Sequence, residues 1–227
     1  MQNAHPLDRP IWSAFTTRQA ALASGDARAV RLKPDYGIFV AAADRSAENL
    51  AALAQLVPAG VPVASVEVGG IPVPPGLEVV STAICNQMIA AHITPGEPDF
   101  EVVALTDVDA PEMLALATLT KPGPFAARTH QLGDFIGVKQ GGRLVAMAGE
   151  RMKPTGFTEV SGVCTLPEWR GRGYAGGLMR LVAARILERG EAPFLHVYAD
   201  NAGAIALYEA LGFRFRQALT MTVLRRK

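Results

Sequence analysis

The sequence predicts an α/β (α+β) protein with a mixed, mostly antiparallel sheet, flanking helices and a smaller N-terminal α/β portion. Three strand-like runs follow one another at residues 135–139, 144–150 and 158–166. Strands joined by such short connections form an antiparallel meander. Further on, apolar residues at helical spacing alternate with short apolar runs. The resulting order in this part of the chain is β-α-β-β-β-α-β-α-β-β.

Length and composition restrict the class of protein. A chain of 227 residues buries a sizeable core and suits one large domain or two small ones. The formal net charge of +1 provides no general attraction to nucleic acid or acidic membranes. Two cysteines make no disulfide framework, and the N-terminus lacks the pattern of a signal peptide. We therefore expect a cytoplasmic protein that binds neither nucleic acid nor membranes.

The first part of the chain reads as a small α/β unit with no motif that carries chemistry. A helical lead-in is expected first, and Ser46 is a good N-cap for a helix ending at Pro58. The apolar patterns predict strands at 36–43, 61–68 and 77–80, and a helix at 83–91. Residues 94–98 are rich in Pro and Gly and predict a linker. We expect residues 1–95 to form a companion domain of unassigned function.

In the second part, residues 99–227, the residues that begin and end helices and turns are easier to recognise. Asp107 or Asp109 caps a helix after a strand at 100–105, and Gly141-Gly142 predicts a hairpin turn. Gly190 suits the C-terminal end of a helix over residues 172–189. The remaining elements expected are a strand at 194–198, a helix at 201–211 and a closing strand pair at 213–224.

The most informative stretch is a glycine-rich turn at the start of the 172–189 helix. Arg170, Gly171, Arg172 and Gly173 place two cations and two residues without side chains at that helix start. Free first-turn N–H groups and the positive helix end bind phosphate well. Cations at this end oppose the helix dipole, so their presence favours an anionic partner. The turn predicts a phosphate-binding site.

A dinucleotide site is the competing interpretation, because Gly171-x-Gly173-x-x-Gly176 also fits that fingerprint and Asp200 lies at about the right distance. In a dinucleotide fold, however, the glycines follow the strand directly, whereas residues 167–170 intervene here. Too few residues follow Gly176 to complete such a sheet. A purely structural helix start is the third possibility.

Two motifs resemble those of a known superfamily. Arg170-x-x-Gly173-x-Ala175 resembles the acyl-CoA-binding signature of the GNAT acyltransferase superfamily. A second GNAT-like element, Asn201-x-x-Ala204-x-x-Leu207-Tyr208-x-x-Leu211-Gly212-Phe213, follows in the right order. The residues around Glu159 and Trp169 look closest to the branch that includes glycine N-acyltransferase. The resemblance covers residues 99–227 and implies that this part is a GNAT-like catalytic domain that binds acyl-CoA.

The resemblance also implies how the donor, acetyl-CoA, is bound. The glycine-rich turn would hold the pyrophosphate. The end of the preceding strand would splay from the 194–198 strand and pair with the pantetheine. The expected donor-binding residues are Val163, Cys164, Thr165, Arg170, Gly171, Arg172, Gly173, Tyr174, Ala175 and Asn201. Cys164 is expected to be a small buried residue rather than a nucleophile.

Two residues match catalytic positions of the superfamily. Tyr208 would protonate the leaving thiolate, although its helical spacing with Ala204 and Leu211 also suits a core tyrosine. Glu159 matches the general base of the glycine N-acyltransferase branch, with a solvated strand carboxylate as the alternative and Glu150 as the fallback base. Phe125, Arg128 and His130 are weaker candidates for acceptor contacts.

The resulting expectation is an N-acyltransferase, acetyl-CoA-dependent and free of metal, that acylates a small amine or an amino acid by direct attack. A non-catalytic acyl-CoA sensor and a protein N-acetyltransferase are the alternatives. A sensor would need the turn but neither Glu159 nor Tyr208. The acceptor, the acyl chain length and the oligomeric state, including a homodimer, stay open.

Overall fold

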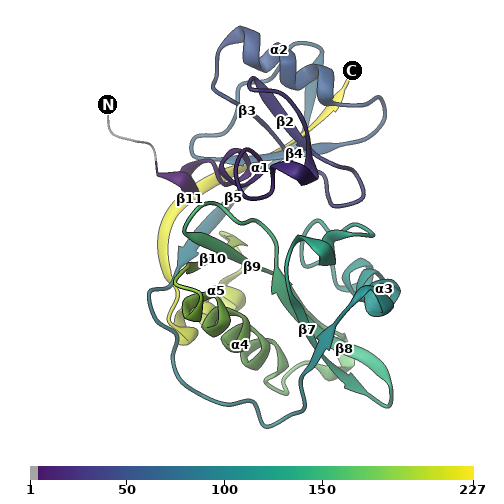
Figure 1. The fold of residues 1–227 in the computed structure, drawn as a ribbon, viewed down its shortest axis with the longest axis vertical. Helices are drawn as coiled ribbons and strands as arrows, with labels where there is room; N and C mark the ends of the chain where they lie inside the picture. The colour runs from purple at the N-terminus through teal and green to yellow at the C-terminus, as the bar shows by residue number, and fades with distance from the viewer. Residues whose placement is uncertain (1–4) are drawn as a thin grey trace.

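A computed structural model describes residues 5–227 and places most of them around one large sheet (Figure 1). The α-helices are α1 (Pro10–Phe15), α2 (Ala47–Leu56), α3 (Ala110–Thr120), α4 (Tyr174–Glu188) and α5 (Ala202–Leu211). The strands are β1 (Ala23–Gly25), β2 (Ala29–Leu32), β3 (Val40–Ala42), β4 (Val63–Glu67), β5 (Leu77–Ile89), β6 (Val103–Leu105), β7 (Phe135–Gln140), β8 (Arg143–Glu150), β9 (Phe157–Thr165), β10 (Ala192–Tyr198) and β11 (Arg214–Arg226). Short 3-10 helices lie at Pro6–Asp8, Ala20–Leu22, Asp107–Asp109, Thr129–Leu132 and Pro167–Trp169.

The large sheet has the strand order β4-β11-β5-β10-β9-β8-β7-β6, and strands β1, β2 and β3 form a separate small sheet. All neighbours in the large sheet pair antiparallel except β9 and β10, which run parallel. The predicted mixed, mostly antiparallel sheet with flanking helices is confirmed. In Figure 1 the long strands β5 and β11 join the upper part of the molecule, with α2 and β4, to the lower part with α4 and α5.

Strands β5 and β11 correct two predictions. The helix expected at 83–91 is wrong, because β5 continues as a strand to Ile89 and pairs with β11 along its length. Its β-branched residues suit a strand, and pairing on both sides outweighs the short helical pattern. The expected strand pair at the C-terminus is the single strand β11. Strands β1 and β2 replace the end of the expected N-terminal helical lead-in.

The position of β5 also bears on the expected domain boundary. β5 lies between β10 and β11, so a strand from residues 1–95 is inserted into the sheet of residues 99–227. A division of the chain near residue 95 would therefore cut the sheet, and the two ranges are not separate layers. The two ranges share one sheet because the last strand, β11, pairs with strands from the first range. Its first half pairs with β5, and its second half pairs with both β4 and β5.

Several local predictions are confirmed by the side chains that make them. Ser46 caps α2, because its hydroxyl accepts a hydrogen bond from the Asn49 N–H. Gly141 and Gly142, with φ of 57° and 83°, turn the chain between β7 and β8 as a type I′ turn requires. Asn201 caps α5 by accepting from the Ala204 N–H, and Gly212 ends that helix in the left-handed conformation.

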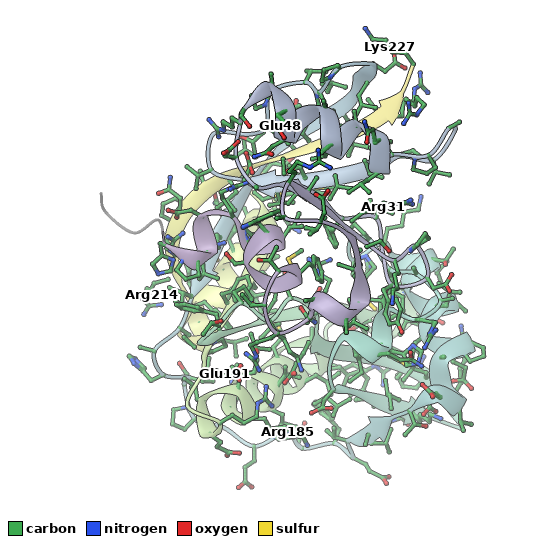
Figure 2. All side chains as sticks on the ribbon, turned by 45° about the horizontal axis from the view of Figure 1, so that its top comes forward. Arg31, Glu48, Arg185, Glu191, Arg214 and Lys227 are labelled. Carbon is green, nitrogen blue, oxygen red and sulfur yellow. The ribbon has the colours of Figure 1, made fainter. Side chains whose placement is uncertain are left out.

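The packing of β10 shows how the sheet is covered on its two faces. Leu195 and Val197 belong to the cluster that contains α4, whereas Phe194 belongs to the cluster that contains α1. Side chains on a strand alternate between faces, so α4 and α1 cover opposite faces of β10. A third cluster joins α2 to the ends of β4 and β11. Figure 2 shows Lys227, which follows β11, and Glu48 of α2 in the same upper part of the molecule.

The gap between β9 and β10 is the feature of the fold that creates the site. The two strands pair only at their first residues, Phe157–Glu159 with Ala192–Phe194. Beyond that point β10 pairs with β5 on its other side, up to Tyr198, and β9 continues against β8. The second halves of β9 and β10 therefore expose backbone groups to the space between them.

Candidate active site

The glycine-rich turn lies at the N-terminus of α4, as the sequence predicted. Gly173 is the N-cap, and the first hydrogen bond within the helix is from the Gly177 N–H to the Gly173 carbonyl. The N–H groups of Tyr174, Ala175 and Gly176 thus point out of the helix end, where they are available to an anion.

The backbone of the turn needs glycine for its conformation. Gly171 and Gly173 both have φ of 77°, a region that side chains other than glycine rarely adopt. A Cβ added at either position would meet no atom within 4 Å. The space in front of the turn is a hollow of about 250 Å³ lined by residues 169–176, Thr165 and Leu207. A phosphate group fits this hollow and the donors around it.

The two arginines of the turn differ in their contacts. The Arg172 guanidinium lies over the Trp169 ring at 4.5 Å from its centroid. Arg170 lines both the hollow and the larger cavity behind it. The Tyr174 side chain is buried and its ring packs against Phe100 and Trp169. Arg170 is therefore the side chain best placed to contact a diphosphate.

A cavity of about 610 Å³ lies where β9 and β10 separate. Its walls include residues 159–165 of β9 and 195–198 of β10, and they also include Thr120 at the end of α3 and residues 121–124 of the loop that follows. The α4–α5 side of the cavity is formed by Arg170, Ala175, Met179, Asn201, Gly203, Ala204, Leu207 and Tyr208. The predicted strand end, Val163 to Thr165, is thus brought together with the glycine-rich turn.

Thr165 stands at the junction of the hollow and the cavity, because it lines both. Its hydroxyl oxygen is buried and has no hydrogen-bond partner within residues 5–227. A buried hydroxyl without a partner is unfavourable unless a ligand or water satisfies it. The Thr165 hydroxyl is therefore available to a polar group of a ligand that extends from the hollow into the cavity.

Cys164 lines the same cavity and is buried. Burial raises the pKa of its thiol to about 11, and it does the same for Cys85, a second cysteine in the cavity wall. Both thiols therefore stay protonated near neutral pH and are poor nucleophiles. This agrees with the expectation that Cys164 is not a nucleophile.

Glu159 is in the cavity wall, as expected, but its carboxylate is fully engaged. Arg151 donates to it twice, from Nε to Oε2 at 2.9 Å and from Nη2 to Oε1 at 2.8 Å. The Met152 N–H also faces Oε2 at 3.3 Å, and His196 Nδ1 lies 2.8 Å from Oε1. The alternative of a solvated strand carboxylate is wrong, because the residue is 1% exposed.

This environment is unsuited to a general base. Burial alone would raise the pKa of the Glu159 carboxyl, but the charge and hydrogen bonds of Arg151, with a further contribution from His196, hold that pKa far below its usual range. A carboxylate so stabilised stays ionised at neutral pH and is a weak base. The geometry therefore argues against the expected proton-accepting role of Glu159.

Glu150, the fallback base, is also not placed for that role. It is buried, it pairs with Arg189 at 2.6 Å and Lys153 at 2.8 Å, and it is not among the residues of the cavity wall. The weaker candidates Phe125, Arg128 and His130 do not line the cavity either. Phe125 packs on Phe135, and His130 contacts Asp107.

Tyr208 lies on α5 and lines the cavity beside Leu207 and Ala204. Burial raises the pKa of its phenol, so the hydroxyl is protonated at neutral pH. A protonated hydroxyl at this point can donate a proton or a hydrogen bond to a group in the cavity. Its ring also packs against Phe213 and the core cluster, so the alternative of a core tyrosine stays open.

Sequence reasoning missed several residues of the site. His196 and Arg151 join Glu159 in one buried network, and the His196 Nε2 atom lies 3.0 Å from the Gln87 amide nitrogen. This amide nitrogen also donates to the Leu7 carbonyl. His196 alternates with Leu195 and Val197 on a predicted strand, which was the only available signal. Phe39, Val66 and Met221 reach the cavity through contacts far apart in sequence.

The comparisons with known proteins agree with this geometry. A family model described as FR47-like protein matches residues 135–221. A solved GNAT-family protein from Novosphingobium aromaticivorans DSM 12444 is 47% identical, covers 98% of this chain and 99% of its own, and superposes with a TM-score of 0.92. The chain belongs to the GNAT family.

Other relatives of this GNAT protein are more distant. N-alpha-acetyltransferase RimI of Mycobacterium tuberculosis (strain ATCC 25618 / H37Rv) is 34% identical over 101 residues, which are 41% of this chain and 62% of RimI. The chain thus matches less than two thirds of RimI. A GCN5-related N-acetyltransferase from Kribbella flavida has a TM-score of 0.66 at 19% identity, over 95% of this chain and 94% of its own. This second likeness shows the fold alone.

Membership of the GNAT family suggests which ligand the hollow and the cavity would bind. GNAT acetyltransferases use acetyl-CoA as the donor, and the hollow at α4 and the gap between β9 and β10 fit its diphosphate and its pantetheine arm. Within residues 5–227, no group of three or more His, Cys, Asp and Glu residues could hold a metal ion. Over the same residues, no helix is long and apolar enough to cross a membrane.

Proposed function

We propose that this protein transfers an acetyl group from acetyl-CoA to the primary amine of a small molecule or amino acid by direct attack. The observation that carries this proposal is the cavity between β9 and β10. It shares Thr165 and Arg170 with the hollow at the start of α4, and the buried network of Arg151, Glu159 and His196 also lines it. A donor and an acceptor that enter from opposite sides would meet inside it.

The donor-binding residues are proposed on their positions. The N–H groups of residues 174–176 and the Arg170 side chain bind the diphosphate, and Gly171 and Gly173 allow it to approach the backbone. Backbone groups of Val163 to Thr165, freed by the separation of β9 from β10, bind the pantetheine arm. Asn201 contributes as the cap of α5 at the cavity wall.

Tyr208 is the proposed general acid. Its phenol is protonated at neutral pH and lies in the wall with the residues of the donor side. It would give its proton to the sulfur of the leaving CoA thiolate, which forms as the C–S bond breaks. The amine must be neutral when it attacks, because an ammonium ion has no free lone pair.

Glu159 is proposed as a fixed carboxylate that holds Arg151 and His196 in place. With its lone pairs engaged and its pKa depressed, it orients the wall of the acceptor site rather than accepting the amine proton. The amine enters the reaction in its neutral form, and after its attack on the thioester carbonyl the amine nitrogen loses its proton to water in the cavity. The glycine N-acyltransferase branch, suggested by residues around Glu159, stays a proposal about ancestry.

The experiment that tests this function measures free thiol with acetyl-CoA and a panel of primary amines. Release of CoA that depends on the amine, with a product heavier by one acetyl group, is the expected result. Binding of acetyl-CoA without any amine-dependent release would favour the acyl-CoA sensor instead.

A protein N-terminus is the second candidate acceptor. It is favoured by the 34% identity to N-alpha-acetyltransferase RimI, although that match leaves the first part of this chain uncovered. Peptides with free N-termini belong in the same panel. Faster turnover of peptides than of free amino acids would identify this alternative.

A further inference from the structure

Part of the cavity wall comes from residues 1–95, to which the sequence assigned no function. Phe39, just before β3, Val66 of β4 and Cys85 of β5 all line it. Met152 and Met221 complete this wall from the C-terminal part. We call Phe39, Val66, Cys85, Met152 and Met221 the acceptor wall.

The acceptor wall is apolar and firmly packed. Phe39, Val66 and Met152 belong to the cluster that α1 covers, and Phe39 is 2% exposed. The Arg151 guanidinium lies over the Phe39 ring at 4.9 Å from its centroid. Side chains held in this way define a shape, so the wall can distinguish acceptors by size and polarity.

The N-terminal part also holds the loop that forms the other side of the cavity. The Asp35 carbonyl accepts a hydrogen bond from the Arg128 N–H at 2.7 Å, and the Tyr36 carbonyl accepts one from the Thr129 hydroxyl at 2.8 Å. The Arg128 guanidinium lies over the Tyr36 ring. These contacts tie the segment just before Phe39 to the segment that follows residues 120–124, and both Phe39 and residues 120–124 line the cavity.

The charges of the cavity disfavour an acceptor with more than one positive charge. Among its lining residues the charged side chains are Lys121, Arg151, Glu159 and Arg170. Glu159 is the one carboxylate in that set, and Arg151 already neutralises it. A second ammonium group would find no free carboxylate on the lining and would be repelled by Lys121, since Arg170 is assigned to the diphosphate of the donor.

We infer that the acceptor is a monoamine whose amino group is carried on an apolar carbon skeleton, and that the acceptor wall selects it through Phe39 and Val66. This inference rests on the proposed function. It assigns residues 1–95 a role in specificity, because the wall cannot form without Phe39, Val66 and Cys85.

The test compares 2-phenylethylamine, ethylamine and spermidine as acceptors, with acetyl-CoA saturating and free thiol as the readout. We expect kcat/KM for 2-phenylethylamine to exceed that for ethylamine by at least about 10–200-fold, which is the discrimination that a single methylene group gives in an apolar pocket. Equal values for these two amines, or a preference for spermidine, would overturn the inference alone. No thiol release with any amine or peptide would overturn the proposed function and this inference with it.

Two variants make the test specific to the wall. Phe39→Leu should raise KM for 2-phenylethylamine about tenfold and leave KM for acetyl-CoA unchanged. Phe15→Leu is the matched control, because Phe15 is equally buried in the same cluster but does not line the cavity. The same change in acceptor KM for both variants would contradict a role for the wall. If Phe39→Leu does not fold, Val66→Ala serves as the second variant, with unfolding midpoints measured for each.

Discussion

Glu159 is a carboxylate with its hydrogen-bonding capacity used up inside the protein. It contacts the Arg151 guanidinium, the Met152 N–H and His196, and it is almost fully buried. A buried ion pair is costly to break, because the remaining partner keeps its charge without compensation. Replacement of Glu159 should therefore lower the stability of the fold as well as the activity.

The first prediction concerns this pair. Glu159→Gln should lower the free energy of unfolding by about 3–5 kcal/mol, because Arg151 is left as an unpaired buried charge. Turnover should fall, and high pH should not restore it. Urea unfolding and pH–rate profiles measure both effects. In the double variant Arg151→Met with Glu159→Gln, at least half of the lost stability should return. Unchanged stability together with rescue at high pH would instead identify Glu159 as the base.

The same pair makes a prediction about acid stability. The pKa of Glu159 is depressed in the folded protein, so the stability it provides is fully present above the unfolded value of about 4.3. That contribution is lost progressively as the pH falls below this value towards the folded pKa. Unfolding curves between pH 5 and about pH 2 should show a smaller acid dependence for the double variant than for the natural protein. Equal slopes for the two proteins would contradict the assignment.

Tyr208 gives the third prediction at this scale. Tyr208→Phe removes the hydroxyl and keeps the ring, so acetyl-CoA binding should hardly change. Turnover should fall by about 10²–10⁴, the usual contribution of a positioned acid. Calorimetry and steady-state rates separate the two quantities. A variant with normal turnover would return Tyr208 to the core tyrosine that its helical spacing also allows.

Among the helices and strands, the start of α4 is the part of the site that could be predicted most directly from the sequence. Its N–H groups, its positive end and the left-handed glycines before it are properties of the backbone. Gly171, Gly173 and the helix that follows were predictable from the sequence because these constraints are local.

The fourth prediction compares two glycines of equal conformation. Gly173→Val should weaken acetyl-CoA binding at least tenfold, because a side chain strains the backbone at φ of 77° and occupies the space in front of the turn. Gly190, which follows the C-terminal end of α4, has φ of 75°, and a Cβ added there would meet no atom within 4 Å. Gly190→Val should cost similar stability and leave binding unchanged. Equal loss of binding in both variants would show that strain alone is responsible.

Other elements could not be predicted because their determinants are not local. Residues 83–91 have an apolar pattern short enough to suit a helix or a strand, and pairing with β10 and β11 decides for the strand. Arg151 and His196 looked like ordinary charged and strand residues. Their role becomes visible only in the fold, where Arg151, just after β8, and His196 of β10 both contact the Glu159 carboxylate of β9.

At the scale of the whole molecule, β5 and β11 make one structure of two parts that the sequence suggested were separate. β11 contacts both β4 and β5, and Arg216 of β11 contacts Gln87 and Asp8 from the first part of the chain. The acceptor wall depends on the same arrangement, since three of its residues precede residue 95.

The fifth prediction follows from that topology. Residues 99–227 alone should fail to fold cooperatively, because removal of β5 leaves β10 and β11 without the strand between them. Circular dichroism during urea unfolding, compared with the full chain, measures this. A cooperative transition in the shortened chain would support an independent C-terminal domain.

The central claim is that the amine attacks bound acetyl-CoA directly within the cavity between β9 and β10. Initial rates at varied acetyl-CoA and 2-phenylethylamine concentrations, or another accepted amine, test it most directly. We predict intersecting lines in double-reciprocal plots and no acetylated protein by mass spectrometry after incubation with acetyl-CoA alone. Parallel lines, together with an acetyl group on Cys85 or Cys164, would contradict direct transfer.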